Sequence, residues 1–147
     1  MGRVGTARLE TLMENVNSTV DMNNSSLSIS AATISSGTLS LSNGASVAQT
    51  VSKGAAVTID KPTGLIELHA ALLGAGAVVH FTVNNTFVEA TDVVVINHHS
   101  VGALGAYVVQ ANTHAAGSFK ITVTNLTSGG LAEALKLHFV VIKGSHT

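Results

Sequence analysis

The sequence predicts an all-β protein, a jelly roll or two-sheet antiparallel β-sandwich, preceded by an N-terminal arm that contains a short helix. Short apolar runs begin at Val47 and recur about every 8 to 14 residues, separated by Gly, Asn and Ser. No segment of helical periodicity lies between these runs, which excludes the β-α-β units of a parallel sheet. The 147 residues suffice for one ordinary domain and one core.

The β domain is expected over residues 47–147, as eight successive strands. They cover residues 47–52, 55–59, 65–69, 79–83, 92–97, 105–112, 118–125 and 135–143. A turn is expected at residues 61–64, around the single proline. The chain therefore predicts a series of short strands joined by tight connections.

Alternation along the strands predicts which side chains fill the core. In the last two strands, Phe119, Ile121 and Val123 share one face, and so do Leu135, Leu137, Phe139 and Val141. The uninterrupted run of residues 93–96 predicts a strand buried on both faces. The aromatic residues, which with the aliphatic ones are expected to form this core, are Phe81, Phe87, Tyr107, Phe119 and Phe139.

Residues 1–46 form the predicted arm. A helix is expected over residues 7–20, where Leu9, Leu12, Met13 and Val16 recur at spacings of three and four. The stripe either folds back on its own domain or docks on a different chain, and we expect a neighbouring chain to cover it. In the nearly uncharged stretch that follows, Leu27, Ile29, Leu39 and Leu41 alternate with Ser, which predicts two short strands or an extended arm that pairs with another sheet.

Composition limits the classes of partner. Hydrophobic residues make up 46% of the chain and charged residues only 10%, against roughly 25% charged in average soluble domains. Such a surface is typical of proteins whose faces are covered by neighbours. The net charge is −1 and the seven Lys and Arg residues do not cluster, so no nucleic-acid partner is expected. Without a signal-peptide core or an 18-residue apolar stretch, we expect a soluble chain made in the cytoplasm, with no membrane partner.

No pattern of catalytic or metal-ligating residues emerges from the sequence. His80 and His138 occupy polar positions of alternating strands. If those strands pair, a third ligand from His69, His98, His99 or His114 could complete a zinc-like site, but ordinary surface or interface histidines are the favoured interpretation. The eight acidic residues are scattered, and no G-x-S-x-G motif marks a nucleophile. We therefore expect no enzyme activity, no metal and no cofactor.

Several stretches resemble small virion proteins of tailed bacteriophages. They are Gln49-Thr50-Val51-Ser52-Lys53 leading into residues 57–64, Phe81-Thr82-Val83-Asn84-Asn85, Ala115-Ala116-Gly117-Ser118-Phe119, and Ala132-Glu133-Ala134-Leu135 before residues 139–144. The similarity is to capsid decoration (cement) proteins, such as that of a Bordetella podophage, and to fibre modules. It covers residues 47–144, carries no catalytic motif and leaves residues 1–46 outside.

The resemblance implies a structural role in a virion. A decoration protein would lie on the outer capsid surface, after synthesis in the host cytoplasm. It would bind the major capsid protein, associate with itself as a homodimer or homotrimer, and clamp neighbouring shell subunits. The alternative is a fibre module or a receptor- or glycan-binding β-sandwich, which shares the same architecture.

Overall fold

A computed structural model describes residues 44–144. The chain divides between Leu39 and Ser40 into two units, and all described residues belong to the second, here called the body. The body has eight strands and, within residues 44–144, no helix that could span a membrane. The strands are β1 (Ala45–Ala48), β2 (Val57–Thr58), β3 (Thr63–Glu67), β4 (Val78–Asn84), β5 (Val93–Ser100), β6 (Tyr107–Ala115), β7 (Ser118–Asn125) and β8 (Lys136–Ile142).

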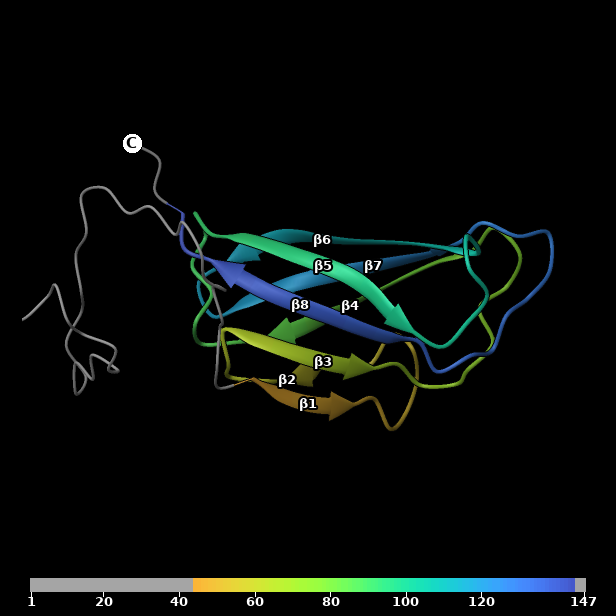
Figure 1. The fold of residues 1–147 in the computed structure, drawn as a ribbon, viewed down its shortest axis with the longest axis horizontal. Coiled ribbons are helices and arrows are strands. Elements are labelled where there is room, and N and C mark those ends of the chain that lie inside the picture. Colours follow the sequence, from red (N-terminus) through yellow and green to blue (C-terminus); the bar gives the residue numbers. More distant parts are fainter. Residues whose placement is uncertain (1–43, 145–147) are drawn as a thin grey trace, which may run out of the picture. The chain divides into compact units, whose positions relative to one another are not determined.

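The eight strands form two four-stranded sheets that lie in two layers (Figure 1). Sheet A has the order β1-β3-β8-β5, and sheet B has the order β2-β4-β7-β6. Each predicted strand of the β domain has a counterpart in this set. The prediction of an all-β fold with two sheets is therefore confirmed for residues 44–144, while the predicted helix over residues 7–20 lies outside the described residues.

The prediction that both sheets are antiparallel is wrong at two strand pairs. β1 pairs with β3 in parallel and β2 pairs with β4 in parallel, whereas the remaining pairs are antiparallel. The cause is the path of the first four strands, which alternate between sheet A and sheet B. Each crossing to the facing sheet reverses the chain direction, so the next strand of the same sheet runs the same way as the previous one. Both sheets are consequently mixed.

The core lies between the two sheets and contains the side chains that alternation predicted. Phe119 of β7 and Phe139 of β8 meet across the layers, with ring centroids 5.4 Å apart and ring planes inclined by 57°. The predicted apolar faces of β7 and β8 are both buried. Phe87 is an exception, because it lies in the connection between β4 and β5 and stays 46% exposed. The core between the sheets is thus mainly aliphatic, with one aromatic pair that joins the two layers.

Two of the boundaries that differ from the sequence prediction lie near the start of the body. The start predicted at residue 47 falls inside β1, which begins at Ala45. Residues 63 and 64, predicted as part of a turn, begin β3. Gly64 allows this, because a Cβ atom there would lie 2.4 Å from Cδ1 of Ile59 and 2.8 Å from Cε1 of Phe139. A glycine that suggests a turn in sequence here admits the close approach of core side chains to a strand.

Candidate protein-docking face on sheet A

The outward side of sheet A is the candidate functional surface, and we call it the A face. Side chains alternate between the two sides of a strand, so the register of the sheet decides which residues share this face. The residues that point outward with their cross-strand partners are Ser46 and Ala48 on β1, Thr63, Leu65 and Glu67 on β3, Lys136, His138, Val140 and Ile142 on β8, and Val93, Val95, Asn97 and Ser100 on β5. Two chemically different halves result from this arrangement.

One half of the A face is aliphatic. Val93 pairs with Ile142, and Val95 pairs with Val140, so four β-branched side chains form two adjacent cross-strand rows. Val93, Val95 and Ile142 are each about half exposed. The expectation that residues 93–96 are buried on both faces is therefore wrong. Sheet B covers only the inward side of sheet A, so the outward residues of β5, an edge strand of sheet A, stay in solvent.

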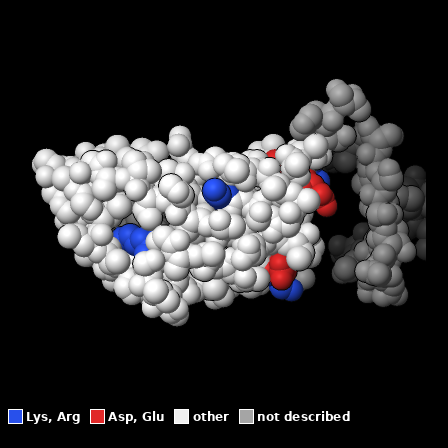
Figure 2. All heavy atoms as spheres, turned by 180° about the vertical axis from the view of Figure 1, so that it is seen from behind, with Lys and Arg blue, Asp and Glu red and all other residues white. Residues whose placement is uncertain are grey.

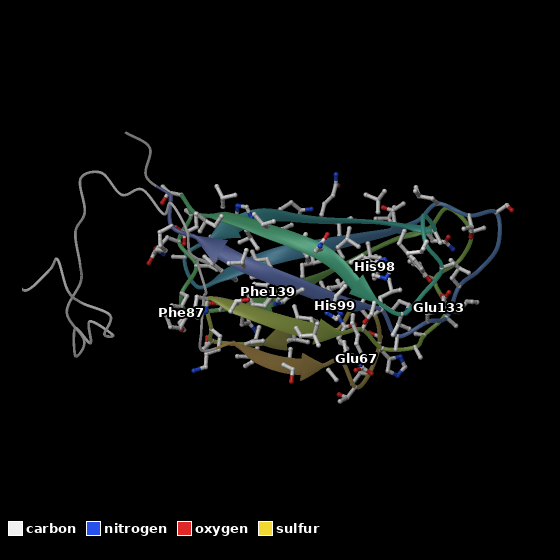
Figure 3. The ribbon with its side chains drawn as sticks, viewed as in Figure 1. Glu67, Phe87, His98, His99, Glu133 and Phe139 are labelled. Carbon is white, nitrogen blue, oxygen red and sulfur yellow. The ribbon has the colours of Figure 1, made fainter. Side chains whose placement is uncertain are left out.

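The other half of the A face is polar. Lys136 and Glu67 form an ion pair with an Nζ–Oε2 distance of 3.5 Å, and both side chains are partly exposed, so the pair contributes little to stability. His99 and His138 meet edge to face, with ring centroids 6.0 Å apart. Figure 3 labels His99 on β5 and Glu67 on β3, the two strands that flank β8. Polar side chains thus border the aliphatic rows.

Three shallow hollows lie along the A face. Their volumes are about 250, 410 and 330 Å³. The third is lined by Val95, Asn97, His138, Phe139 and Val140, and it joins the aliphatic rows to the histidine pair. Leu65 lines each of the other two. Broad, shallow relief of this kind suits contact with a protein surface better than enclosure of a small ligand, which usually occupies a deep cleft.

Comparison of the chain with models of protein families, with curated proteins and with solved structures gives no match.

The histidines do not assemble as the zinc hypothesis required. His80 lies on β4 in sheet B and His138 on β8 in sheet A, and both point away from the core, on opposite sides of the body. Their strands belong to different sheets, so no cross-strand pairing brings the rings together. Within residues 44–144, no three His, Asp or Glu side chains are arranged to hold a metal ion. The pair that does form, His99 with His138, was not anticipated.

A second polar cluster lies where the connections of the body meet. Lys53 is buried, and its Nζ donates hydrogen bonds to the carbonyl oxygens of His69 and Glu133, each 2.6 Å away. Burial lowers the pKa of Lys53. The hydroxyl of Tyr107 donates to the carboxylate of Glu133, which lowers the pKa of Glu133, while burial and that same bond raise the pKa of Tyr107. These bonds hold the connections in place, so the cluster has a structural role.

The interface residues proposed from sequence all lie in the arm and outside the described residues. They are Leu9, Leu12, Met13, Val16, Leu27, Ile29, Leu39 and Leu41. The A face is a surface that sequence reasoning did not identify. Alternation in β8 was a usable signal, because it places Lys136, His138, Val140 and Ile142 opposite the buried residues. The residues that β5 adds to the A face could not be predicted from local sequence, because their place depends on the pairing of β5 with β8.

Proposed function

We propose that the chain is a virion structural protein, a capsid decoration (cement) protein with a jelly-roll body that docks on major capsid subunits through the A face. The observation that carries the proposal is the pair of rows Val93–Ile142 and Val95–Val140, in which Val93, Val95 and Ile142 are exposed and Val140 is partly buried. Contiguous exposed apolar patches rimmed by polar groups mark interaction surfaces. The neighbouring ion pair and histidines supply such a rim.

The aliphatic rows would give each contact a modest strength. Full burial of one such side chain is worth about 1.5–3 kcal/mol, and roughly half of that remains to be gained where a side chain is already half covered. The three half-exposed side chains then contribute about 2–4.5 kcal/mol, which is at most comparable to the rotational and translational cost of association. One contact is therefore weak. An oligomer that makes two or more such contacts gains about 10²–10⁴-fold in avidity, which is how a cement protein would clamp neighbouring subunits.

The direct test is binding of the purified full-length protein to shells that lack it. The variant Val95→Lys places a charge within the aliphatic rows, and Gln110→Lys places the same charge on the outward side of sheet B. We expect Val95→Lys to reduce the sedimenting fraction at least tenfold and Gln110→Lys to leave it unchanged, with equal melting temperatures. Equal binding by both variants would refute docking through the A face.

Copy number separates decoration from the alternative of a fibre or a receptor- or glycan-binding module. A decoration protein is present in proportion to the shell subunits, whereas a fibre module is confined to a few sites per particle. A reconstruction of the source particle at side-chain resolution would measure this. Density for the body at fibre sites alone would refute the proposal in favour of the alternative.

The arm has its own test in the full chain. The triple variant with Leu9, Leu12 and Val16 replaced by Ser removes the apolar stripe. If a neighbouring chain covers that stripe, the variant melts at the wild-type temperature but binds shells or other copies more weakly. A lower melting temperature with binding intact would show that the stripe packs on its own chain.

A further inference from the structure

Three connections meet at one end of the body, and each exposes a leucine. They are residues 68–77 between β3 and β4, 101–106 between β5 and β6, and 126–135 between β7 and β8, gathered on the right of Figure 1 and here called the loop end. Leu72 is 71% exposed, Leu104 is 98% exposed and Leu126 is 58% exposed. A single exposed leucine is ordinary, but three on connections that are hydrogen-bonded to one another need an explanation.

The loop end is almost free of charge. Its three connections contain one residue with a formal charge at neutral pH, Glu133, whose carboxylate accepts the hydrogen bond from Tyr107. In Figure 2 this end lies on the left, where the outermost surface is white and a blue basic side chain is visible farther in. Two copies of such a surface can meet without repulsion between like charges, which any contact between identical surfaces requires.

The leucines are displayed on a rigid frame. Leu73 and Leu131 form a two-way backbone bridge, with N–O distances of 2.8 and 2.9 Å, that joins the first and third connections. The amide N–H of Leu126 donates to the carbonyl of Ala106 at 2.8 Å, which joins the second and third. The side chain of Asn125 is fully buried beneath them and donates to Gly129 O at 2.7 Å. A rigid surface loses little conformational freedom on binding.

The backbone at the loop end is also strained. Val101 has a φ of 63°, a left-handed conformation that β-branched residues rarely adopt, and Gly102 and Gly105 follow with φ of 92° and 76°. The ring Nε2 of His98 donates to the carbonyl of Val101 at 2.5 Å and helps to hold it. Strain of this kind persists where the surrounding structure imposes it, and it concentrates at functional surfaces.

Each connection of the loop end pairs a projecting leucine with an open glycine. A Cβ atom added at Gly76, Gly105 or Gly129 would meet no atom within 4 Å. Leu72 and Gly76 lie in the first connection, Leu104 and Gly105 in the second, and Leu126 and Gly129 in the third. The glycines add no side chain beside the leucines, so the leucines are the large apolar groups that project from this surface.

We propose that the loop end is a self-association surface that binds the loop end of a second copy about a twofold axis. The proposal deepens the oligomerisation included in the proposed function, but it rests on a surface separate from the A face. A lipid surface is the less favoured occupant. The three connections carry no Lys, Arg, Trp or Tyr to engage headgroups, and their irregular backbone would have to enter the bilayer.

The first test is the oligomeric state of the full-length protein, measured by sedimentation velocity over a concentration series. We expect a monomer–dimer equilibrium, with Leu104→Ser raising its dissociation constant roughly tenfold or more. Leu104 is almost fully exposed, so this variant should melt like the wild type. The control Val93→Ser removes an exposed aliphatic side chain from the A face and should leave the dissociation constant unchanged.

The second test locates the contact, and it uses the absence of cysteine from the sequence. Ala103→Cys places one thiol at the loop end, and Ala116→Cys places one at the β6–β7 turn, toward the opposite end of the body; both alanines are exposed. On mild oxidation, Ala103→Cys should give a disulfide-linked dimer faster than Ala116→Cys. Equal rates, or faster linkage of Ala116→Cys, would overturn the proposal.

Two further results would overturn it. One is a protein that remains monomeric at all concentrations or whose association Leu104→Ser does not weaken. The other is a monomer that co-sediments with phosphatidylcholine vesicles and loses this binding in Leu104→Ser, which would assign the surface to lipid. Failure of Val95→Lys to reduce shell binding would count against the A face alone, so the two proposals fail separately.

Discussion

Replacing Asn125 by Ala should remove the bonds that tie the loop end to the body. The side chain is fully buried at the end of β7. Its Nδ2 group lies within hydrogen-bond distance of the carbonyl oxygens of Leu73, Gly74 and Gly129, at 3.0, 2.9 and 2.7 Å. Its Oδ1 atom accepts from the N–H and the hydroxyl of Thr127, at 2.9 and 2.8 Å. A methyl group replaces none of these contacts.

The magnitude follows from the groups left without partners. An amide nitrogen has two hydrogens, so at least two carbonyl oxygens lose a donor, and the N–H of Thr127 loses its acceptor. Each buried polar group without a partner costs about 1–3 kcal/mol, with the lower end applying where water enters the gap. We expect the free energy of unfolding to fall by about 2–4 kcal/mol. For a domain of this size, that lowers the melting temperature by roughly 8–32 °C.

The assay is urea unfolding followed by circular dichroism, with Asn112→Ala as the matched control. Asn112 donates a side-chain bond from its Nδ2 to the hydroxyl of Thr122 at 2.8 Å, on the outward side of sheet B, and its Oδ1 accepts an exposed bond from the hydroxyl of Thr113 at 3.4 Å. Because it is only partly buried, its removal should cost less than about 1 kcal/mol. If Asn125→Ala loses no more stability than Asn112→Ala, the buried amide is not what holds the loop end.

Four further predictions concern the body. Phe119→Ala should lower the free energy of unfolding by about 3–5 kcal/mol in urea, and a loss under 1 kcal/mol would contradict the aromatic contact between sheets. The hydrogen bond from Lys143 holds the pKa of Asp92 below its ordinary value. The ionised Asp92 carboxylate therefore stabilises the folded state above about pH 4, and this stabilisation is lost as the pH falls through the folded-state pKa. In thermal melts from pH 7 to pH 2.5, the melting temperature of Asp92→Asn should fall less than that of the wild type. Equal falls in melting temperature would refute this. Val101→Gly should stabilise by about 0.5–1 kcal/mol, because glycine adopts the left-handed conformation without strain, and a net loss in urea would refute stored strain. A fragment beginning at Ser40 should melt cooperatively, since β1 to β8 lie within it, and a melt without a transition by circular dichroism would show dependence on the arm.

For the A face, the sequence predicts which side chains of a strand point outward but not which strands lie beside one another. Alternation in β8 separates Phe139 from His138 and Val140, and the structure has this separation. The partners of Val140 are Thr63 on β3 and Val95 on β5, from segments 77 and 45 residues away in the chain. No local sequence pattern predicts that β8 pairs with β3 and β5. The continuous run of residues 93–96 was likewise ambiguous, because burial of both its faces requires that both sides of the sheet are covered, and the central strand β8 also exposes His138 and Ile142.

Buried polar residues were the other class that sequence reasoning missed. Asn85 and Asn125 are fully buried, and each accepts a hydrogen bond from the backbone N–H two residues later. A signal was present, since Asn at the end of an apolar strand often makes this local turn bond. The sequence did not predict that the side-chain amides of Asn85 and Asn125 also donate to the carbonyl oxygens of Lys61 and Leu73, which lie on distant connections. Those contacts exist only after the sheets have stacked.

The sequence by itself determined the number and order of the strands and the inner face of most of them. Those properties follow from two local rules, the alternation of side chains along an extended backbone and the preference of Gly, Asn and Ser for turns. The tertiary structure decided the division of strands between sheets, the parallel pairs at β1 and β2, and the meeting of three leucines at the loop end. Strand pairing is made by backbone groups that every residue carries, so the identity of a partner depends on how the whole chain packs and not on local side-chain pattern.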